Sequence, residues 1–227
     1  MIKVSEPFLI PEFQRPYSWG KFTVSQLLQD IENAVNTQKK HFFGSIVLVK
    51  QDNGNLVIDG QQRLTTCYLF VAAIYNLLKQ REILHKDSKF SLQDCQQNYS
   101  QKNIKYSAEQ INSLVLYAEF GKQFDHRNIA LRAIGEDDIV FSSIVKGNEN
   151  ELTKEQKQNK LYKSYKQIYS YLNRSTDFDK YFDSLDTLEI IKIIIGQGDD
   201  NPQKIFESIN TTGEPTNPLL HNNQTAV

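Results

Sequence analysis

The stretch that decides the fold is FFGSIVLVKQDNGNLVIDGQQRLTT, residues 42–66. Its first part, residues 42–50, is rich in β-branched and aromatic side chains and predicts a strand. Residues 55–59 predict a second strand, and the turn-forming sequence QDNG at residues 51–54 lies between the two. The two strands are therefore expected to form a hairpin at the front of the fold.

A helix is expected to follow the second strand at once. From Arg63 to about Lys79 the apolar residues recur every three or four positions, as on the buried face of a helix. The strand ends in Asp59-Gly60, so the helix begins close beside it. The first N–H groups of a helix have no partners within the helix and carry the positive end of its dipole. A strand–glycine–helix junction is thus able to bind an anion such as phosphate.

The residues at this junction have side chains suited to a phosphate ligand. Gly60 removes a side chain where a phosphate would approach the backbone. Gln61 and Gln62 donate or accept hydrogen bonds, and Arg63 presents a planar fork to phosphate oxygens. Asp59 is suited to hold a metal ion, to orient water or to cap the helix. The residues alone leave a second interpretation open, a capped helix that carries a surface arginine.

A second polar pair, Gln14-Arg15, precedes the hairpin among aromatic residues and prolines. Pro11 and Pro16 predict an extended arm, and a helix is expected to begin near Thr23. An arginine among aromatic rings can stack on a base or bind phosphate. The alternative is an arm that its aromatic side chains pin to the body of the protein, with Arg15 paired to a carboxylate.

The later part of the chain is predicted to be mostly helical, with one late strand. A capping box at Thr153–Gln156 predicts a helix start, and LEIIKIII at residues 188–195 predicts a strand. Asn201-Pro202 predicts the start of a last helix. On that helix Glu207 and Asn210 lie three residues apart and share a face, so both would reach one site. Capping of the helix end explains Asn210 equally well.

The composition is that of a globular protein without a strong charge. The chain has 227 residues, 39% of them hydrophobic, and a formal net charge of -1. This balance argues against a strongly basic face that grips DNA, so any nucleic-acid contact would be local or supplied elsewhere. Cys67 falls within an apolar helical stripe and is expected to be a small core residue. We find no signal peptide and no apolar run of membrane length, so we expect a cytoplasmic protein that does not enter a membrane.

Three segments carry a resemblance to a known family. IPEFQRPYSW at residues 10–19, VIDGQQRLTT at residues 57–66 and IFESINTTGEP at residues 205–215 resemble, in the same order, the N-terminal domain of GmrSD-type restriction endonucleases. That family is typified by a DGQQR motif and is similar to the ParB/sulfiredoxin-like fold. Asp30-Ile31 and Phe43-Gly44-Ser45 match two further family elements, so the resemblance covers nearly the whole chain.

The resemblance implies an α+β fold, in which a small ParB/sulfiredoxin-like sheet with a β-hairpin at the front is surrounded and followed by predominantly α-helical structure. Residues 1–105 would form the core with the DGQQR motif. Residues 106–227 would form a mainly helical region whose late strand and last helix close the same domain. The polar tail, residues 214–227, is expected to be disordered. Family members often continue into an HNH-type nuclease module, a motif that this sequence lacks.

The resemblance also implies a site. Family members act in defence against phage or modified foreign DNA, and the DGQQR segment is tied to nucleotide hydrolysis or to nuclease activity. Transferred position by position, the motif would carry the catalysis, the arm would complete the nucleotide pocket, and the last helix would close it. The implied catalytic residues are Asp59, Gln61, Gln62 and Arg63, and the implied nucleotide-binding residues are Gln14, Arg15, Gly60, Arg63, Thr65, Glu207 and Asn210.

The leading hypothesis is a domain that binds and hydrolyses a nucleoside triphosphate with a divalent cation, Mg²⁺, and Asp59 is the residue considered for the metal. Two alternatives stay open. One is a DNase that acts at the same pocket, and the other is a non-catalytic module that senses nucleotide or DNA and acts through a partner nuclease. The expected partners are a nucleoside triphosphate, DNA in the full system, and a nuclease subunit or C-terminal domain. Homo-oligomerisation is also left open.

Overall fold

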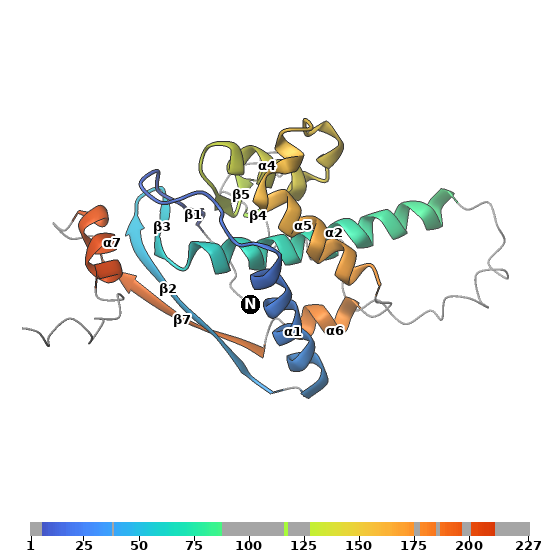
Figure 1. Ribbon diagram of the computed structural model, residues 1–227, viewed down its shortest axis with the longest axis horizontal. Coiled ribbons are helices and arrows are strands. Elements are labelled where there is room, and N and C mark those ends of the chain that lie inside the picture. The colour runs from blue at the N-terminus through green and yellow to red at the C-terminus, as the bar shows by residue number, and fades with distance from the viewer. Residues whose placement is uncertain are drawn as a thin grey trace, which may run out of the picture.

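A computed structural model of the chain shows a mixed sheet with most helices packed on one of its faces (Figure 1). The structure describes residues 6–37, 39–87, 116–117, 128–174, 178–184, 187–196 and 201–211. The strands are β1 (Phe8–Leu9), β2 (His41–Gln51), β3 (Gly54–Asp59), β4 (Leu116–Tyr117), β5 (Asn128–Ile129), β6 (Leu131–Arg132) and β7 (Leu188–Ile195). The helices are α1 (Lys21–Thr37), α2 (Gln61–Asp87), α4 (Gly135–Lys146), α5 (Lys160–Leu172), α6 (Phe178–Ser184) and α7 (Pro202–Thr211), with short 3₁₀ turns η1 (Glu149–Glu151) and η2 (Gln156–Gln158).

The main sheet has five strands in the order β6-β1-β3-β2-β7. The pair β2/β3 is antiparallel, whereas β1/β3, β1/β6 and β2/β7 are parallel. The late strand β7 therefore lies beside the first long strand, far from it in sequence. The predicted mixture of a small sheet, a front hairpin and predominantly helical structure is confirmed. The likeness to the ParB/sulfiredoxin-like fold stays a prediction.

The hairpin forms where the turn residues predict it. Gln51 pairs with Gly54, so Asp52 and Asn53 form a two-residue loop. A loop of this length suits the twist of two antiparallel strands. Gly54 has a φ of +146°, and a Cβ there would lie 2.6 Å from the carbonyl oxygen of Pro7. The hairpin is thereby held close to the chain that enters β1.

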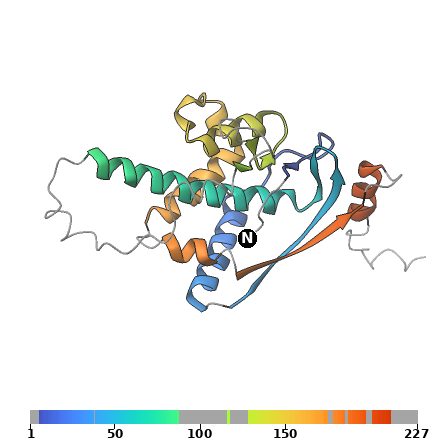
Figure 2. The same cartoon turned by 180° about the vertical axis from the view of Figure 1, so that it is seen from behind.

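The two faces of the sheet are covered by different helices, because side chains alternate along each strand. Ile46, Leu48 and Val57 belong to the main core, which α1, α2, α4 and α5 cover. The opposite face carries Val47, Val49, Leu56 and Ile58, and α7 covers it with Ile205, Phe206 and Ile209. Seen from behind, α7 stands at the far end of the sheet from α1 and α6 (Figure 2). Helices α2 and α7 thus lie on opposite faces.

Several helix starts differ from the sequence prediction. Helix α1 begins at Lys21, before Thr23, because the carbonyl of Gly20 already accepts the N–H of Val24. Helix α2 begins at Gln61 and runs to Asp87, so the QQR triplet forms its first turn. The correction matters for the site, since these side chains are placed by helical geometry.

The capping predictions in the second half are borne out in a modified form. Thr153 and Gln156 exchange the two reciprocal hydrogen bonds of a capping box, at 2.9 and 3.2 Å, but they open the 3₁₀ turn η2. Helix α5 is capped instead by Asn159, whose side-chain oxygen accepts the N–H of Leu161. The side chain of Asn201 accepts the N–H of Gln203 and caps α7 as predicted.

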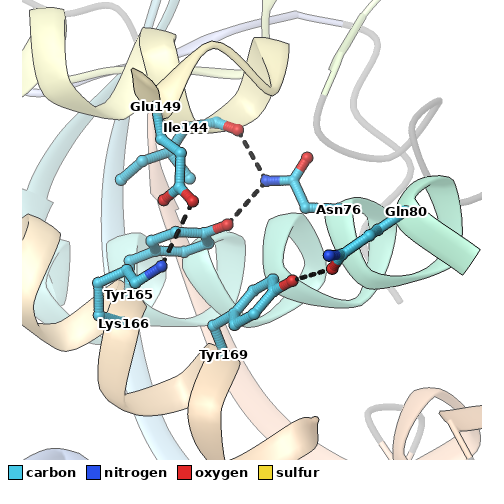
Figure 3. A network of polar contacts seen from close by, with 7 residues as sticks. All are labelled: Asn76, Gln80, Ile144, Glu149, Tyr165, Lys166 and Tyr169. Atoms are coloured by element: carbon cyan, nitrogen blue, oxygen red, sulfur yellow. Dashed lines mark hydrogen bonds and ion pairs between the residues drawn. The ribbon is translucent and has the colours of Figure 1, made fainter. Parts of the chain in front are cut away.

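A polar network fastens α2 to α4 and α5 (Figure 3). The side-chain amide of Asn76 donates to the carbonyl oxygen of Ile144 and to the hydroxyl of Tyr165, both at 3.0 Å. One turn further along α2, Gln80 accepts a hydrogen bond from the hydroxyl of Tyr169. The Asn76 bonds are partly buried and the Gln80 bond is exposed, and together they join three helices through side chains. The network therefore anchors the helix whose first turn carries the DGQQR motif.

The boundary predicted at residues 105/106 stays a prediction, and the tail, residues 214–227, lies outside the described residues. Both β7 and α7, from the predicted second region, pack against the front sheet. None of the helices in the described part of the chain has the length and apolar character needed to cross a membrane.

Candidate functional site at the start of helix α2

The junction between β3 and α2 is tightly packed against β2. Gly60 has a φ of +86°, which side chains rarely tolerate. A Cβ at Gly60 would lie 2.6 Å from Cγ2 of Ile46 and 2.7 Å from the carbonyl oxygen of Ser45. The glycine therefore allows the chain to turn from the strand into the helix directly over β2, and this contact fixes where α2 begins.

Replacing Gly60 by alanine is expected to lower the free energy of unfolding by about 2 to 3 kcal/mol, because the methyl group adds backbone strain to a steric clash. Gly20→Ala is the matched control, since a Cβ at Gly20 would meet nothing within 4 Å. Urea unfolding of the two variants and the wild type measures the difference. Equal stability of Gly60→Ala and Gly20→Ala would contradict the packing described.

Arg63 lies half-buried against the main chain of β2. Its Nη1 donates a hydrogen bond to the carbonyl oxygen of Ser45 at 3.0 Å. Gly44 has a φ of +109°, and a Cβ there would lie 2.9 Å from Nε of Arg63. The absence of a side chain at Gly44 thus makes room for the guanidinium. Because a guanidinium carries five N–H groups, this arginine can hold the main chain and an anion together.

Gln62 is buried and binds the main chain of the arm, residues 10–19. Its Oε1 accepts the N–H of Ser18 at 2.8 Å and that of Trp19 at 3.4 Å. Its Nε2 donates to the carbonyl oxygen of Pro16 at 3.4 Å. The N–H and carbonyl groups of the extended arm have no hydrogen-bond partners within a helix, so the side-chain amide of Gln62 serves as their partner. Gln62 therefore positions the arm over the first turn of α2.

Two further glutamines bind the arm to the junction. Gln61 Nε2 donates to the carbonyl oxygen of Arg15 at 3.0 Å. Gln14, itself buried, donates from Nε2 to the carbonyl oxygens of Val57 and Ile58 at 2.6 and 2.9 Å. The amide of Gln14 is thus directed at β3, and the side chain of Arg15 is exposed.

The third predicted segment reaches the arm from the other face of the sheet. The rings of Phe13 and Phe206 lie 5.6 Å apart between centroids. Glu207 is exposed and accepts a hydrogen bond from the side chain of Gln203 at 3.1 Å. Asn210 lies in the last turn of α7, and its side chain falls outside the described residues. The arm therefore contacts both other segments, while α2 and α7 stay on opposite sides of the sheet.

The described structure has a small cavity at the motif and a larger cleft whose lining includes no residue of the motif. A cavity of about 10 Å³ between the arm, α2 and α4, lined in part by Gln61 and Thr65, has room for one water at most. A cleft of about 350 Å³ lies between α1 and β2. Ligand pockets for small molecules typically begin at about 300 Å³. The residues that line this cleft include Trp19, Gln26, Asp30, His41, Phe42 and Phe43.

Asp137 is a site residue that the sequence prediction missed. Its carboxylate is 5% exposed, accepts the N–H of Tyr17 at 2.6 Å, and accepts the side-chain amide of Asn159 at 2.8 Å. It ties the arm to α4 and to the cap of α5. The sequence signal was an acidic first turn, Glu136 to Asp138, which indicates a helix start but not which carboxylate is buried.

Cys67 lies on α2 about one turn beyond Arg63, the last residue of the motif. The residue keeps a partly exposed surface, yet burial among its neighbours raises the pKa of its thiol to about 12. The reactive species is the thiolate, whose fraction at pH 8 is then roughly a thousandfold below that of an ordinary cysteine. We expect Cys67 in a Cys95→Ser variant to react with a disulfide reagent at pH 8 far more slowly when folded than in urea. Equal rates would contradict the buried position.

The same pKa shift predicts a pH dependence of stability. A raised pKa in the folded state means that the folded state holds the proton more tightly than the unfolded chain. The contribution of Cys67 to stability is thus complete below its ordinary pKa of 9.0 and is lost as the pH rises toward 12. Burial raises the pKa of Tyr17 in the same direction.

A dedicated metal site is not formed by side chains in the described ranges, because they contain no group of three or more histidine, cysteine, aspartate or glutamate residues. Asp59, at the end of β3, is half-buried and offers a single carboxylate beside the motif. Mg²⁺ usually keeps several waters and binds through one or two carboxylates together with substrate phosphates. The donor set thus fits a cation that arrives with a nucleotide.

Comparison with known proteins agrees with this arrangement of motifs. No curated protein matches the chain. The family of the GmrSD restriction endonuclease N-terminal domain matches over residues 1–220, which include the arm, the DGQQR junction and α7. Since the match covers nearly the whole chain, the protein belongs to the family of GmrSD restriction endonuclease N-terminal domains.

Proposed function

We propose that the protein binds and hydrolyses a nucleoside triphosphate at the start of α2, as the nucleotide domain of a restriction-type defence protein. The observation that carries the proposal is the placement of Arg63. Its side chain extends from the first turn of α2, donates to the carbonyl oxygen of Ser45 and passes beside Gly44, the chain neighbour of Phe43, which lines the cleft of about 350 Å³. Helix N–H groups, a fixed arginine and a nearby open cleft together suit a phosphate chain.

In this proposal the phosphates lie beside the first turn of α2, on the side of the Arg63 guanidinium and not under the arm, and Arg63 neutralises the charge that develops on the transferred phosphoryl group. Asp59 supplies a carboxylate for Mg²⁺, which offsets phosphate charge when bound. We assign to Gln61, whose side chain donates to the carbonyl oxygen of Arg15, the orientation of a water that attacks the terminal phosphorus. The bond to the bridging oxygen breaks, and nucleoside diphosphate and inorganic phosphate leave with the proton of the water.

Other sequence-derived candidates take supporting roles. Gln14 and Gln62 hold the arm in place through main-chain hydrogen bonds, and Thr65 is buried and lines the small cavity together with Gln62. Arg15 is exposed on the arm and is proposed as a second phosphate contact. Glu207 and Asn210 lie on the helix across the sheet, so they would act on the pocket only from the far side of the arm.

The test is the release of phosphate from each of the four nucleoside triphosphates with Mg²⁺, measured beside equilibrium binding by calorimetry. Release that depends on both protein and Mg²⁺ supports a hydrolase. Binding without release indicates a non-catalytic sensing module, and neither binding nor release contradicts the proposal.

The sensing module is the second candidate, and one observation favours it. Two of the glutamines expected in catalysis or nucleotide binding, Gln14 and Gln62, are buried. Their side-chain amides form hydrogen bonds with the main chain. Such a module would bind nucleotide and change the position of the arm, which a partner nuclease would detect. The family of restriction endonucleases supports DNA and a nuclease domain or subunit as partners in either case. A DNase acting at the same residues is tested by incubating the chain with DNA and Mg²⁺.

A further inference from the structure

We infer that the solvent face of α5, together with the turn η2 that precedes it, binds the phosphate backbone of double-stranded DNA. Lysine recurs at every third position through this part of the chain, at Lys154, Lys157, Lys160, Lys163 and Lys166. Residues 152–174 contain six basic residues and one acidic residue, Glu155, a net charge of +5. The rest of the chain contains the other 20 basic and 26 acidic residues, a net charge of -6. The near-neutral total thus combines one basic segment with an acidic remainder.

The lysines of α5 lie on the side of the helix that faces solvent. Lys160 and Lys163 are exposed. Leu161, Tyr165 and Ile168 are buried on the opposite side, in the main core. In Figure 1, α5 crosses in front of α2, on the side of the molecule that faces the viewer. A helix of 13 residues is roughly 20 Å long, and duplex DNA carries about one negative charge per 1.7 Å, so roughly twelve phosphate charges lie along such a length.

Most of these lysines have no acidic partner. Within the described part of the chain, no ion pair is formed by Lys154, Lys157, Lys160 or Lys163. Lys166 is paired with Glu149 at 3.3 Å (Figure 3). Opposite charges three or four residues apart stabilise a helix and like charges destabilise it, yet α5 contains no acidic residue at all. A polyanion bound along this face would supply the opposite charges that the helix lacks.

The row of lysines is held by the protein core and begins beside the arm. The hydroxyl of Tyr165 accepts a hydrogen bond from Asn76 on α2 at 3.0 Å (Figure 3). Leu161, the chain neighbour of Lys160, lines the small cavity that Arg15 also lines. A duplex that follows α5 would therefore lie close to the arm that contacts the DGQQR motif. DNA bound there would not need to enter the cleft between α1 and β2.

This face suits a duplex better than a single strand. Proteins that bind single strands without sequence preference stack the bases on aromatic rings. The tyrosines of α5 are not exposed, since they are buried or half-buried at Tyr162, Tyr165, Tyr169 and Tyr171. Lysine contacts with phosphates position a protein on a duplex but carry no sequence information. We therefore expect binding through the backbone, with a strong dependence on salt and none on base sequence.

The test is the binding of a fluorescein-labelled duplex of about 20 base pairs to the full chain, measured by anisotropy at several salt concentrations without nucleotide. We expect the logarithm of the association constant to fall linearly with the logarithm of the salt concentration. A triple variant carries Lys154→Gln, Lys160→Gln and Lys163→Gln. Its slope should be smaller by about three, one for each lost phosphate contact, and its affinity should be lower by about tenfold or more.

The control variant carries Lys39→Gln, Lys192→Gln and Lys204→Gln, which remove three exposed lysines from other elements and change the net charge equally. It should keep the wild-type slope. Circular dichroism checks that both variants are folded, as expected for exposed side chains. Equal losses in the two variants, or a wild type that binds no duplex, overturn the inference. Tighter binding of a single strand of the same sequence also overturns it, as does a triple variant that loses binding to phosphatidylserine vesicles but not to the duplex.

Discussion

Replacement of Arg63 by alanine is expected to lower kcat/KM for nucleotide hydrolysis by about 100- to 1000-fold. The guanidinium is the cation that helical geometry places at the start of α2, where the phosphates are proposed to lie. Its contact with Ser45 holds it in position before substrate binds, so little reorganisation is needed during the reaction. The measurement is steady-state phosphate release with Mg²⁺ under matched conditions.

Two controls separate the loss of charge from the loss of structure. Arg63→Lys keeps the charge but not the planar fork, so it should recover only part of the activity. Arg174→Ala removes an exposed arginine after α5 and should leave the rate unchanged. Urea unfolding of all three variants checks that they remain folded. Full activity in a folded Arg63→Ala variant would show that the arginine only holds β2.

Replacement of Asp137 by alanine is expected to lower the free energy of unfolding by about 3 to 5 kcal/mol. The carboxylate accepts the N–H of Tyr17 and the amide of Asn159 from a buried position. Hydrogen bonds to charged groups contribute more than neutral ones, and the variant leaves a buried N–H of the arm without its acceptor. The arm would then loosen from α4, and nucleotide binding should weaken with it.

Glu136→Ala is the matched control for this prediction. Glu136 is exposed in the same first turn of α4, so the variant removes the same charge near the same helix terminus. Its cost should stay below about 1 kcal/mol. Urea unfolding of both variants provides the comparison. Equal costs would mean that Asp137 acts only through the helix dipole and does not hold the arm.

Local patterns predicted the elements that depend on neighbouring residues. The hairpin at residues 51–54 and the strand at residues 188–195 follow from turn chemistry and β-branched composition. The cap at Asn201 follows from its position before a proline. The predicted start of α1 at Thr23 was two residues late, because the carbonyl of Gly20 accepts the first helical hydrogen bond and Thr23 lies within the first turn. Short-range chemistry thus decides these elements, within a few residues at their ends.

The site depends on long-range packing that such patterns do not contain. The sequence predicted the glutamines of the arm and the motif as site residues. It did not show that the side-chain amides of Gln14 and Gln62 form hydrogen bonds with the main chain. Pro11 and Pro16 keep the arm out of regular structure, so its N–H and carbonyl groups need side-chain partners. The cleft was missed because residues of the arm, of α1 and of β2 line it together, an arrangement that only the packing of α1 beside β2 produces.

The most direct test of the central claim is a crystal structure of the chain with the β,γ-imido analogue of GTP and Mg²⁺. The account predicts the triphosphate within hydrogen-bonding distance of the Arg63 guanidinium and of the first N–H groups of α2. A triphosphate bound away from α2, with Arg63 still contacting only Ser45, would contradict it.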